Sequence, residues 1–352
     1  MNRRISRKAS NPGGGSLAIA AIVIIVVIIA AAFFMMSGGG EGASPTETAV
    51  SPPAGGEKVH LIMSTGSPGG IYNPLGFRIA EVVSKYSDKV EITAQESGAS
   101  VANAKAIKNG DAQLAIMQSD VAYFAYNGLY LSDFEGNPVS NLRALAALYP
   151  EPIQIIARAD VDVKTIWDLE GKVVAVGNPG SGLYATAYTI LSALNLWDKI
   201  VKQELGLKDV PQQIKQGTVD VFFLVSGVPT PKIEQLAVQV NLNLVDVPDD
   251  ALQKIQAAGL GSLYLPYTIP AKSYEFQEKE VKTVTVVALF VASADVPDDI
   301  IYNILEVMFD NLDEIKTVHE RAADISLDKA ATVPIPLHPG AERFYRDRGV
   351  LG

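Results

Sequence analysis

Three polar segments of the chain carry side chains and backbone groups that could bind a ligand. They are the glycine-rich run Thr65–Tyr72, the triplet Gln118-Ser119-Asp120, and a second glycine-rich run, Gly177–Gly182. Glycine lets the backbone turn tightly and approach a bound molecule. A helix that begins after such a turn offers free N–H groups and the positive end of its dipole. Each glycine-rich run therefore predicts a seat for a small anion.

Neither glycine-rich run matches a nucleotide-binding motif. No Gly-Lys-Ser/Thr follows the first run, and the G-x-G-x-x-G spacing is missing. A plain structural turn would explain either run alone. Taken together, one run in each half of the chain predicts two helix N-termini facing one cleft. Such a cleft suits a small anion, especially a molecule with a carboxylate at each end.

Other polar residues support the same hypothesis, each with a structural alternative. Ser119 or Asp120 could cap the next helix instead of meeting a ligand. Arg158, in an apolar strand, could pair with a ligand carboxylate or with a structural acid. Tyr72 could contact the ligand or only fill the space between domains. The candidate ligand-binding residues are Gly66, Ser67, Gly69, Gly70, Tyr72, Gln118, Ser119, Asp120, Arg158, Asn178, Gly180, Ser181 and Gly182.

Composition excludes several classes of site. The chain has no cysteine, and its three histidines are far apart in sequence, so we expect no metal, no cofactor and no catalytic residues. An enzyme would have to use carboxylates such as Glu96 and Asp120 with hydroxyl groups. The net charge of −10 in 352 residues argues against nucleic-acid binding, which needs a basic surface.

The elements that position these segments alternate between strand and helix, which predicts an α/β fold with parallel sheets and helices on their faces. The pattern starts again near residue 150. We therefore predict two lobes, one of residues 58–150 plus 285–352 and one of residues 151–284. A strand is predicted at Pro152–Arg158, where the pattern restarts, and the long apolar strand Val284–Ala292 should cross back to the first lobe. Two strands that cross between the lobes would form a hinge.

The N-terminal region predicts a membrane association. Residues 1–16 are basic, and Leu17–Met36 holds 20 residues without a charged side chain, enough for a helix of about 30 Å that spans a bilayer. The basic flank keeps the N-terminus in the cytoplasm. Residues 37–57, rich in Gly, Ser, Thr and Pro, should be a flexible tether. We expect the folded part at the outer face of the membrane, anchored there or released by signal cleavage.

Five segments in this order resemble the TAXI family of TRAP-transporter solute-binding proteins. They are Thr65–Gly76, Thr93–Gly128, Val174–Gly182, Phe222–Pro231 and Pro334–Gly349. The resemblance implies a two-lobed periplasmic-binding-protein type II fold, also called a Venus flytrap. It also implies a membrane permease driven by an ion gradient as partner. The ligand would be a small carboxylate such as glutamate, glutamine or 2-oxoglutarate.

The chain departs from the TAXI pattern at two places. Asn73 stands where the family usually has an aromatic residue, and Leu183-Tyr184 replaces a Thr and a polar residue. The departure makes Tyr184 a candidate substitute donor to the ligand. Two alternatives stay open at this point: a receptor for an ATP-driven transporter, and a membrane-tethered sensor with the same fold.

Overall fold

The computed structural model describes residues 58–352. The predicted membrane segment Leu17–Met36 and the tether 37–57 lie outside the described residues. Within residues 58–352, no helix is both long and apolar enough to cross a membrane.

The first lobe is built on a mixed sheet. Its parallel strands β2, β1 and β3 are followed by β10 and β4, where β10 runs antiparallel to both of its neighbours. The strands are β1 (Val59–Ser64), β2 (Val90–Gln95), β3 (Leu114–Gln118), β4 (Leu142–Arg158) and β10 (Val281–Ser293). The helices of this lobe are α2 (Tyr72–Tyr86), α3 (Ser100–Asn109), α4 (Ser119–Asn127), α9 (Asp298–Asp310), α10 (Leu312–Lys316), η3 (Glu320–Asp324), α11 (Leu327–Ala330) and α12 (Pro339–Asp347).

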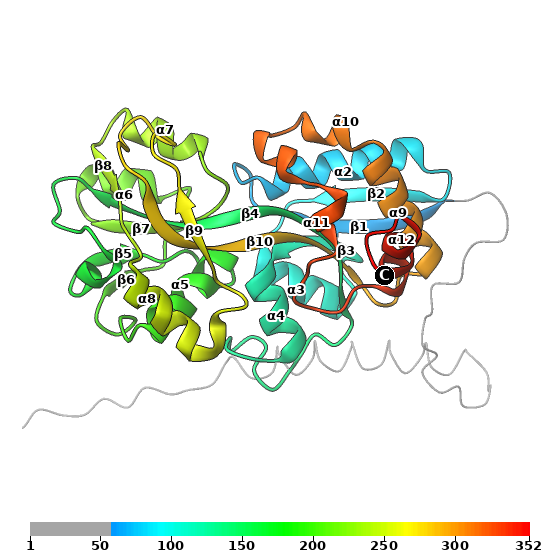
Figure 1. The fold of residues 1–352 in the computed structure, drawn as a ribbon, viewed down its shortest axis with the longest axis horizontal. Helices are drawn as coiled ribbons and strands as arrows, with labels where there is room; N and C mark the ends of the chain where they lie inside the picture. The colour runs from blue at the N-terminus through cyan, green and yellow to red at the C-terminus, as the bar shows by residue number, and fades with distance from the viewer. Residues whose placement is uncertain (1–57) are drawn as a thin grey trace, which may run out of the picture. The chain divides into compact units, whose positions relative to one another are not determined.

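Helices cover both faces of this sheet because its strands bury side chains on both sides. Leu114 and Ile116 of β3 enter a core formed with α2, α9 and α12. Ala115 and Met117, which point the other way, enter a core formed with α3 and α4. The apolar run of β3 thus supports two layers of helices (Figure 1).

The second lobe continues the same sheet in the order β4-β7-β5-β6, while β8 pairs with β4 and β9 pairs with β10. Its strands are β5 (Val173–Ala175), β6 (Val201–Gln203), β7 (Val221–Val225), β8 (Leu242–Leu244) and β9 (Leu265–Ile269). Its helices are η1 (Ile166–Leu169), α5 (Gly182–Ala193), α6 (Val210–Gln216), α7 (Pro231–Ala237), α8 (Asp249–Ile255) and η2 (Gln256–Leu260).

Two long strands, β4 and β10, join the lobes and run beside each other between them (Figure 1). The first part of β4 pairs with β10 as far as Pro152, and from Ile153 it pairs with β7. The prediction of two crossing strands is confirmed, and the fold is the two-lobed type II class. The lobe boundaries at residues 150/151 and 284/285 stay a prediction.

The strand β4 begins at Leu142, ten residues before the start that the sequence predicted. Pro150 and Pro152 argue against a strand interior because proline lacks the N–H that a strand donates. Both prolines lie before Ile153, where β7 begins to pair with β4, so along this stretch β4 pairs with β10 on one side. The missing N–H groups are therefore tolerated.

Strand polarity decides which loops face the other lobe. Gln118 at the end of β3 pairs with Ala288, and β1 is parallel to β3, so both strands end toward the second lobe. Val225 at the end of β7 pairs with Ile153, and β5 is parallel to β7, so both strands end toward the first lobe. The carboxyl ends of four strands therefore face each other across the region that β4 and β10 span.

Candidate functional site

Four loops follow these strand ends and form the candidate site. The first lobe supplies residues 65–71 and the 118–119 junction, and the second lobe supplies residues 176–181 and 226–230. In open α/β sheets, ligands bind beyond the carboxyl ends of the strands. The arrangement places both predicted glycine-rich runs at the strand ends that face each other.

Gly182, the first residue of α5, comes directly against the first lobe. A Cβ atom at this position would lie 2.0 Å from Gln118 Oε1 and 2.6 Å from Ser100 Oγ. Only glycine leaves room at this position for the side chains of Gln118 and Ser100. Ser181 caps α5, because its Oγ accepts a hydrogen bond from the Tyr184 backbone N–H at 3.1 Å and donates one to the Asn178 carbonyl at 2.7 Å.

A buried polar cluster joins the lobes beside Gly182. The Gln118 amide donates to Thr186 Oγ1 at 2.7 Å, and Thr186 Oγ1 donates to Asp120 Oδ2 at 2.7 Å. The Tyr264 hydroxyl donates to the same Asp120 oxygen at 2.8 Å. Burial raises the pKa of Asp120, and the hydrogen bonds from Thr186 and Tyr264 act in the opposite direction. We name Gln118, Asp120, Thr186 and Tyr264 the inter-lobe polar cluster.

A second buried carboxyl group lies on the crossing strand β4. Glu151 is 3% exposed, and its Oε2 accepts a hydrogen bond from the Tyr72 hydroxyl at 2.5 Å. Burial raises the pKa of Glu151 to about 8, the Tyr72 bond lowers it, and the charge of Asp120 raises it further. Tyr72, which ends the first glycine-rich run, is thereby connected to the strand that crosses between the lobes.

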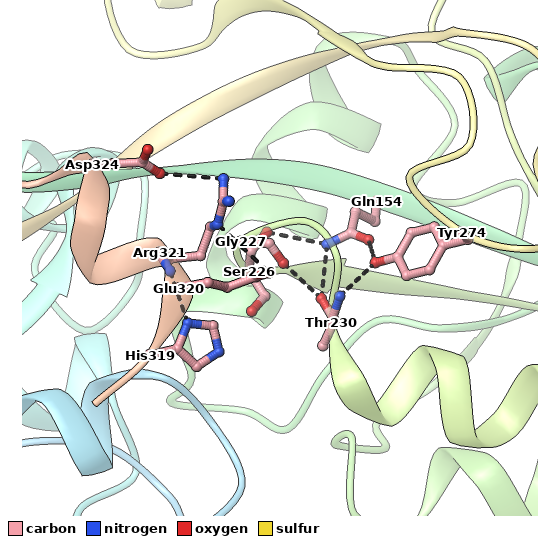
Figure 2. Close-up of polar contacts among 9 residues, drawn as sticks. All are labelled: Gln154, Ser226, Gly227, Thr230, Tyr274, His319, Glu320, Arg321 and Asp324. Carbon is pink, nitrogen blue, oxygen red and sulfur yellow. Dashed lines mark hydrogen bonds and ion pairs between the residues drawn. The ribbon is translucent and has the colours of Figure 1, made fainter. Parts of the chain in front are cut away.

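The loop after β7 is held by a polar network within the second lobe. Gln154 on β4 donates to the Ser226 carbonyl at 3.1 Å and to Thr230 Oγ1 at 3.2 Å, and it accepts a hydrogen bond from the Tyr274 hydroxyl. Figure 2 shows Arg321 of the first lobe beside the turn at Ser226 and Gly227. This contact brings the C-terminal segment of the chain to the candidate site.

The first glycine-rich run is mostly exposed at its tip. Ser67, Gly69 and Gly70 are exposed, and the Gly70 N–H donates to the Ser67 carbonyl at 3.2 Å. Gly66 is buried against Tyr72, since a Cβ atom added to Gly66 would lie 3.0 Å from Tyr72 Cβ. The run therefore forms a tight turn before α2, as the sequence predicted.

Other predicted site residues make structural contacts. Ser119 Oγ accepts a hydrogen bond from the Val287 N–H on β10 at 3.0 Å. In the second lobe, the Asn178 side chain lies against Gly206. Gly180 has a positive φ of 83°, which suits a glycine turn. The Tyr184 ring packs edge-on against Trp197. The side chains of Ser119 and Tyr184 thus have protein partners.

The structure corrects the prediction that Arg158 binds the ligand. It ends β4 at the side of the second lobe that points away from the first, and its guanidinium pairs with Asp160 at 2.9 and 2.7 Å and approaches Asp220 at 3.9 Å. The structural alternative, a salt bridge to an acid, describes this residue. The strand continues in one direction, so Arg158, five residues beyond Ile153, cannot lie at the strand ends that face the first lobe.

Sequence reasoning missed five residues of the site. They are Ser100, Glu151, Thr186, Tyr264 and Arg321. Thr186 follows Gly182 by one helical turn and could have been found by that spacing. Glu151 is a charged residue between two prolines in an apolar segment, and this pattern could also have marked it as a candidate site residue. Tyr264 and Arg321 come from distant segments and carry no local signal.

Within residues 58–352, no group of three or more His, Asp or Glu side chains is placed to hold a metal ion. The expected absence of a metal, a cofactor and a catalytic residue stays a prediction.

The comparison with family models decides which family the chain represents. The model of the NMT1-like family matches residues 63–349, nearly the whole of the described region. The chain belongs to the NMT1-like family. The TAXI subtype stays a prediction for this NMT1-like chain.

Several solved structures are similar to this NMT1-like chain at low sequence identity. The periplasmic aliphatic sulphonate binding protein SsuA from Escherichia coli is 15% identical with a TM-score of 0.49, over 84% of this chain and 95% of that chain. The binding protein component of an ABC phosphonate transporter from Pseudomonas aeruginosa is 10% identical with a TM-score of 0.49, over 77% and 80%. A putative L-cystine ABC transporter from Listeria monocytogenes is 13% identical with a TM-score of 0.47, over 76% and 98%.

Gly182 provides a direct test of the inter-lobe contact. The Gly182→Ala variant should lower the free energy of unfolding by about 1–3 kcal/mol, because the added methyl group overlaps Gln118 and Ser100. Urea unfolding of the full-length protein measures this. Gly70→Ala is the control, since its Cβ would meet only the Ser67 carbonyl at 3.6 Å. Equal stability of the two variants would contradict the contact.

Proposed function

We propose that this chain is an extracytoplasmic solute-binding receptor, which binds a small carboxylate between its lobes and delivers it to a membrane transporter. One observation carries the proposal: the strand ends of both lobes, with their glycine turns and polar side chains, face each other across two continuous crossing strands. Two lobes joined in this way can close on a ligand by a hinge motion.

We propose that the binding site for the carboxylate is formed by the two glycine-rich runs. Among residues 58–352, no side chain caps the first turn of α2, so the N–H groups there keep their capacity to donate. α5 begins with Gly182 directly against the first lobe. In the inter-lobe polar cluster the donors of Gln118, Thr186 and Tyr264 are already bonded within the cluster, which favours the glycine runs as the anion site.

A binding role fits these contacts better than catalysis. A general base must keep an oxygen free for a substrate proton. Both oxygens of Asp120 accept hydrogen bonds from protein groups, and Glu96 is exposed on the surface. We therefore propose a receptor without enzymatic activity.

The partner is proposed to be a TRAP-type permease driven by an ion gradient, supported by the resemblance of five ordered segments to the TAXI family. The lobes are proposed to comprise residues 58–150 plus 285–352 and residues 151–284, at the outer face of a membrane that the N-terminal segment reaches. A receptor of an ATP-driven transporter is the alternative. Uptake into vesicles that carry each type of permease distinguishes the two.

Calorimetric titration of the full-length protein tests the binding function. We expect heat and a dissociation constant in the low-micromolar range or below, about −8 kcal/mol, for at least one of L-glutamate, L-glutamine and 2-oxoglutarate. The free cation putrescine serves as a control ligand of similar size and should give no heat. The absence of heat with every acid at millimolar concentration would contradict the proposal.

A further inference from the structure

Arg321 lies where three segments of the candidate site meet. It belongs to η3 of the first lobe. A Cβ atom built on Gly227 of the second lobe would lie 2.3 Å from Arg321 Cγ, 2.7 Å from Arg321 Cδ and 3.3 Å from Ile71 Cδ1. Arg321 and the loop after β7 are therefore in contact (Figure 2), and Ile71 at the end of the first glycine-rich run lies beside them.

The guanidinium group of Arg321 is incompletely paired. Its Nη1 donates to Asp324 Oδ2 at 3.3 Å, a long hydrogen bond, and its Nε is 3.9 Å from Glu320 Oε1, beyond hydrogen-bond distance. Within the described residues 58–352, the Nε atom is buried and has no hydrogen-bond partner. A buried donor without an acceptor costs free energy and requires an explanation.

The loop that faces Arg321 cannot easily move away. Thr230 Oγ1 donates to the Gly227 carbonyl at 2.7 Å, and the Thr230 N–H donates to the Tyr274 hydroxyl at 3.0 Å. Gln154 bonds both Ser226 and Thr230. A side chain at position 227 would therefore displace Arg321 rather than the loop, since the overlap is with the stem of Arg321 and not with its tip.

The positive charge of Arg321 indicates a role in binding the ligand. The buried carboxyl groups of this region, Asp120 and Glu151, supply no positive charge, so a carboxylate ligand buried there needs a cation beside it. A guanidinium presents a planar fork of donors that matches a carboxylate. We propose that Arg321 receives a carboxylate group of the ligand, and that Gly227 leaves the space in which the second lobe closes against it. This inference rests on the receptor function proposed above.

Calorimetric titration of L-glutamate, L-glutamine and 2-oxoglutarate into full-length variants tests the inference. For the acid that the parent protein binds, we expect Arg321→Met to weaken the affinity at least about 100-fold and Arg321→Lys about 10-fold, because lysine keeps the charge but not the fork. Gly227→Ala should weaken it by a similar factor with Arg321 intact. Arg348→Met, which removes an exposed ion pair with Asp310, is the control and should stay within about twofold.

The outcomes separate this inference from the receptor function. No heat from the parent protein with L-glutamate, L-glutamine or 2-oxoglutarate overturns the receptor function, and this inference with it. Binding by the parent and equally tight binding by Arg321→Met overturns this inference alone. If Arg321→Met does not fold, Arg321→Lys and Gly227→Ala decide: parent-like affinity in both overturns the inference, and weakened affinity at an unchanged ligand-free melting temperature supports it.

Discussion

The free energy of unfolding of the Glu151→Gln variant is expected to fall less than that of the parent protein as the pH rises from about 4.5 to about 8. Burial raises the pKa of Glu151, so between these values the folded protein holds a proton that the unfolded chain releases. The stability of the parent therefore falls with rising pH, by about 1.4 kcal/mol per pH unit from this group. Glutamine cannot ionise, and its Oε1 can still accept the Tyr72 hydrogen bond.

Urea unfolding of parent and variant at several pH values from 5 to about 8.5 measures this effect. His319 and His338, whose pKa values burial lowers from 6.5, contribute the opposite slope at acidic pH, so the two proteins must be compared at each pH. Glu135→Gln, at an exposed glutamate, is the control and should follow the parent. If the difference in the free energy of unfolding between Glu151→Gln and the parent is the same at all pH values, the prediction is wrong.

The second large effect is expected at Asp120. The Asp120→Ala variant should lose about 3–5 kcal/mol of stability, because the buried hydroxyls of Thr186 and Tyr264 lose their shared acceptor, and each unsatisfied buried group costs about 1–3 kcal/mol. The backbone N–H of Val121, bonded to Asp120 at 2.8 Å, also loses its partner. Since the inter-lobe polar cluster joins the lobes, we also expect weaker ligand binding.

A double-mutant cycle with Tyr264→Phe isolates this interaction. If Tyr264 acts through Asp120, the double variant should be less destabilised than the sum of the single variants. Asp198→Ala, at a residue whose side chain is 94% exposed, is the control and should change stability by less than about 0.5 kcal/mol. Additive effects of Asp120→Ala and Tyr264→Phe would refute the cluster as a unit.

These two carboxyl groups show the limit of local reasoning. The Gln118-Ser119-Asp120 triplet is visible in the sequence as a polar strand end, and its position at the end of β3 is confirmed. Its partners Thr186 and Tyr264 are 66 and 144 residues away from Asp120. Whether Asp120 faces a ligand or satisfies two hydroxyls depends on those partners, which no spacing within the triplet can reveal.

The sequence by itself determined the fold class of the protein and most of its strands and helices. Apolar periodicity, glycine turns and the restart near residue 150 were enough for an α/β fold of two lobes with crossing strands, because these signals act between neighbouring residues. The exception was the first part of β4, where Pro150 and Pro152 concealed a strand that pairs with β10.

Only the tertiary structure decided which polar residues meet. It removed Arg158 from the site by pairing it with Asp160, and it brought in Glu151 and Arg321. The physical reason is that hydrogen bonds, burial and pKa shifts are set by groups that touch across the two lobes. Those contacts follow from the direction and register of β4 and β10, and not from the order of residues along either lobe.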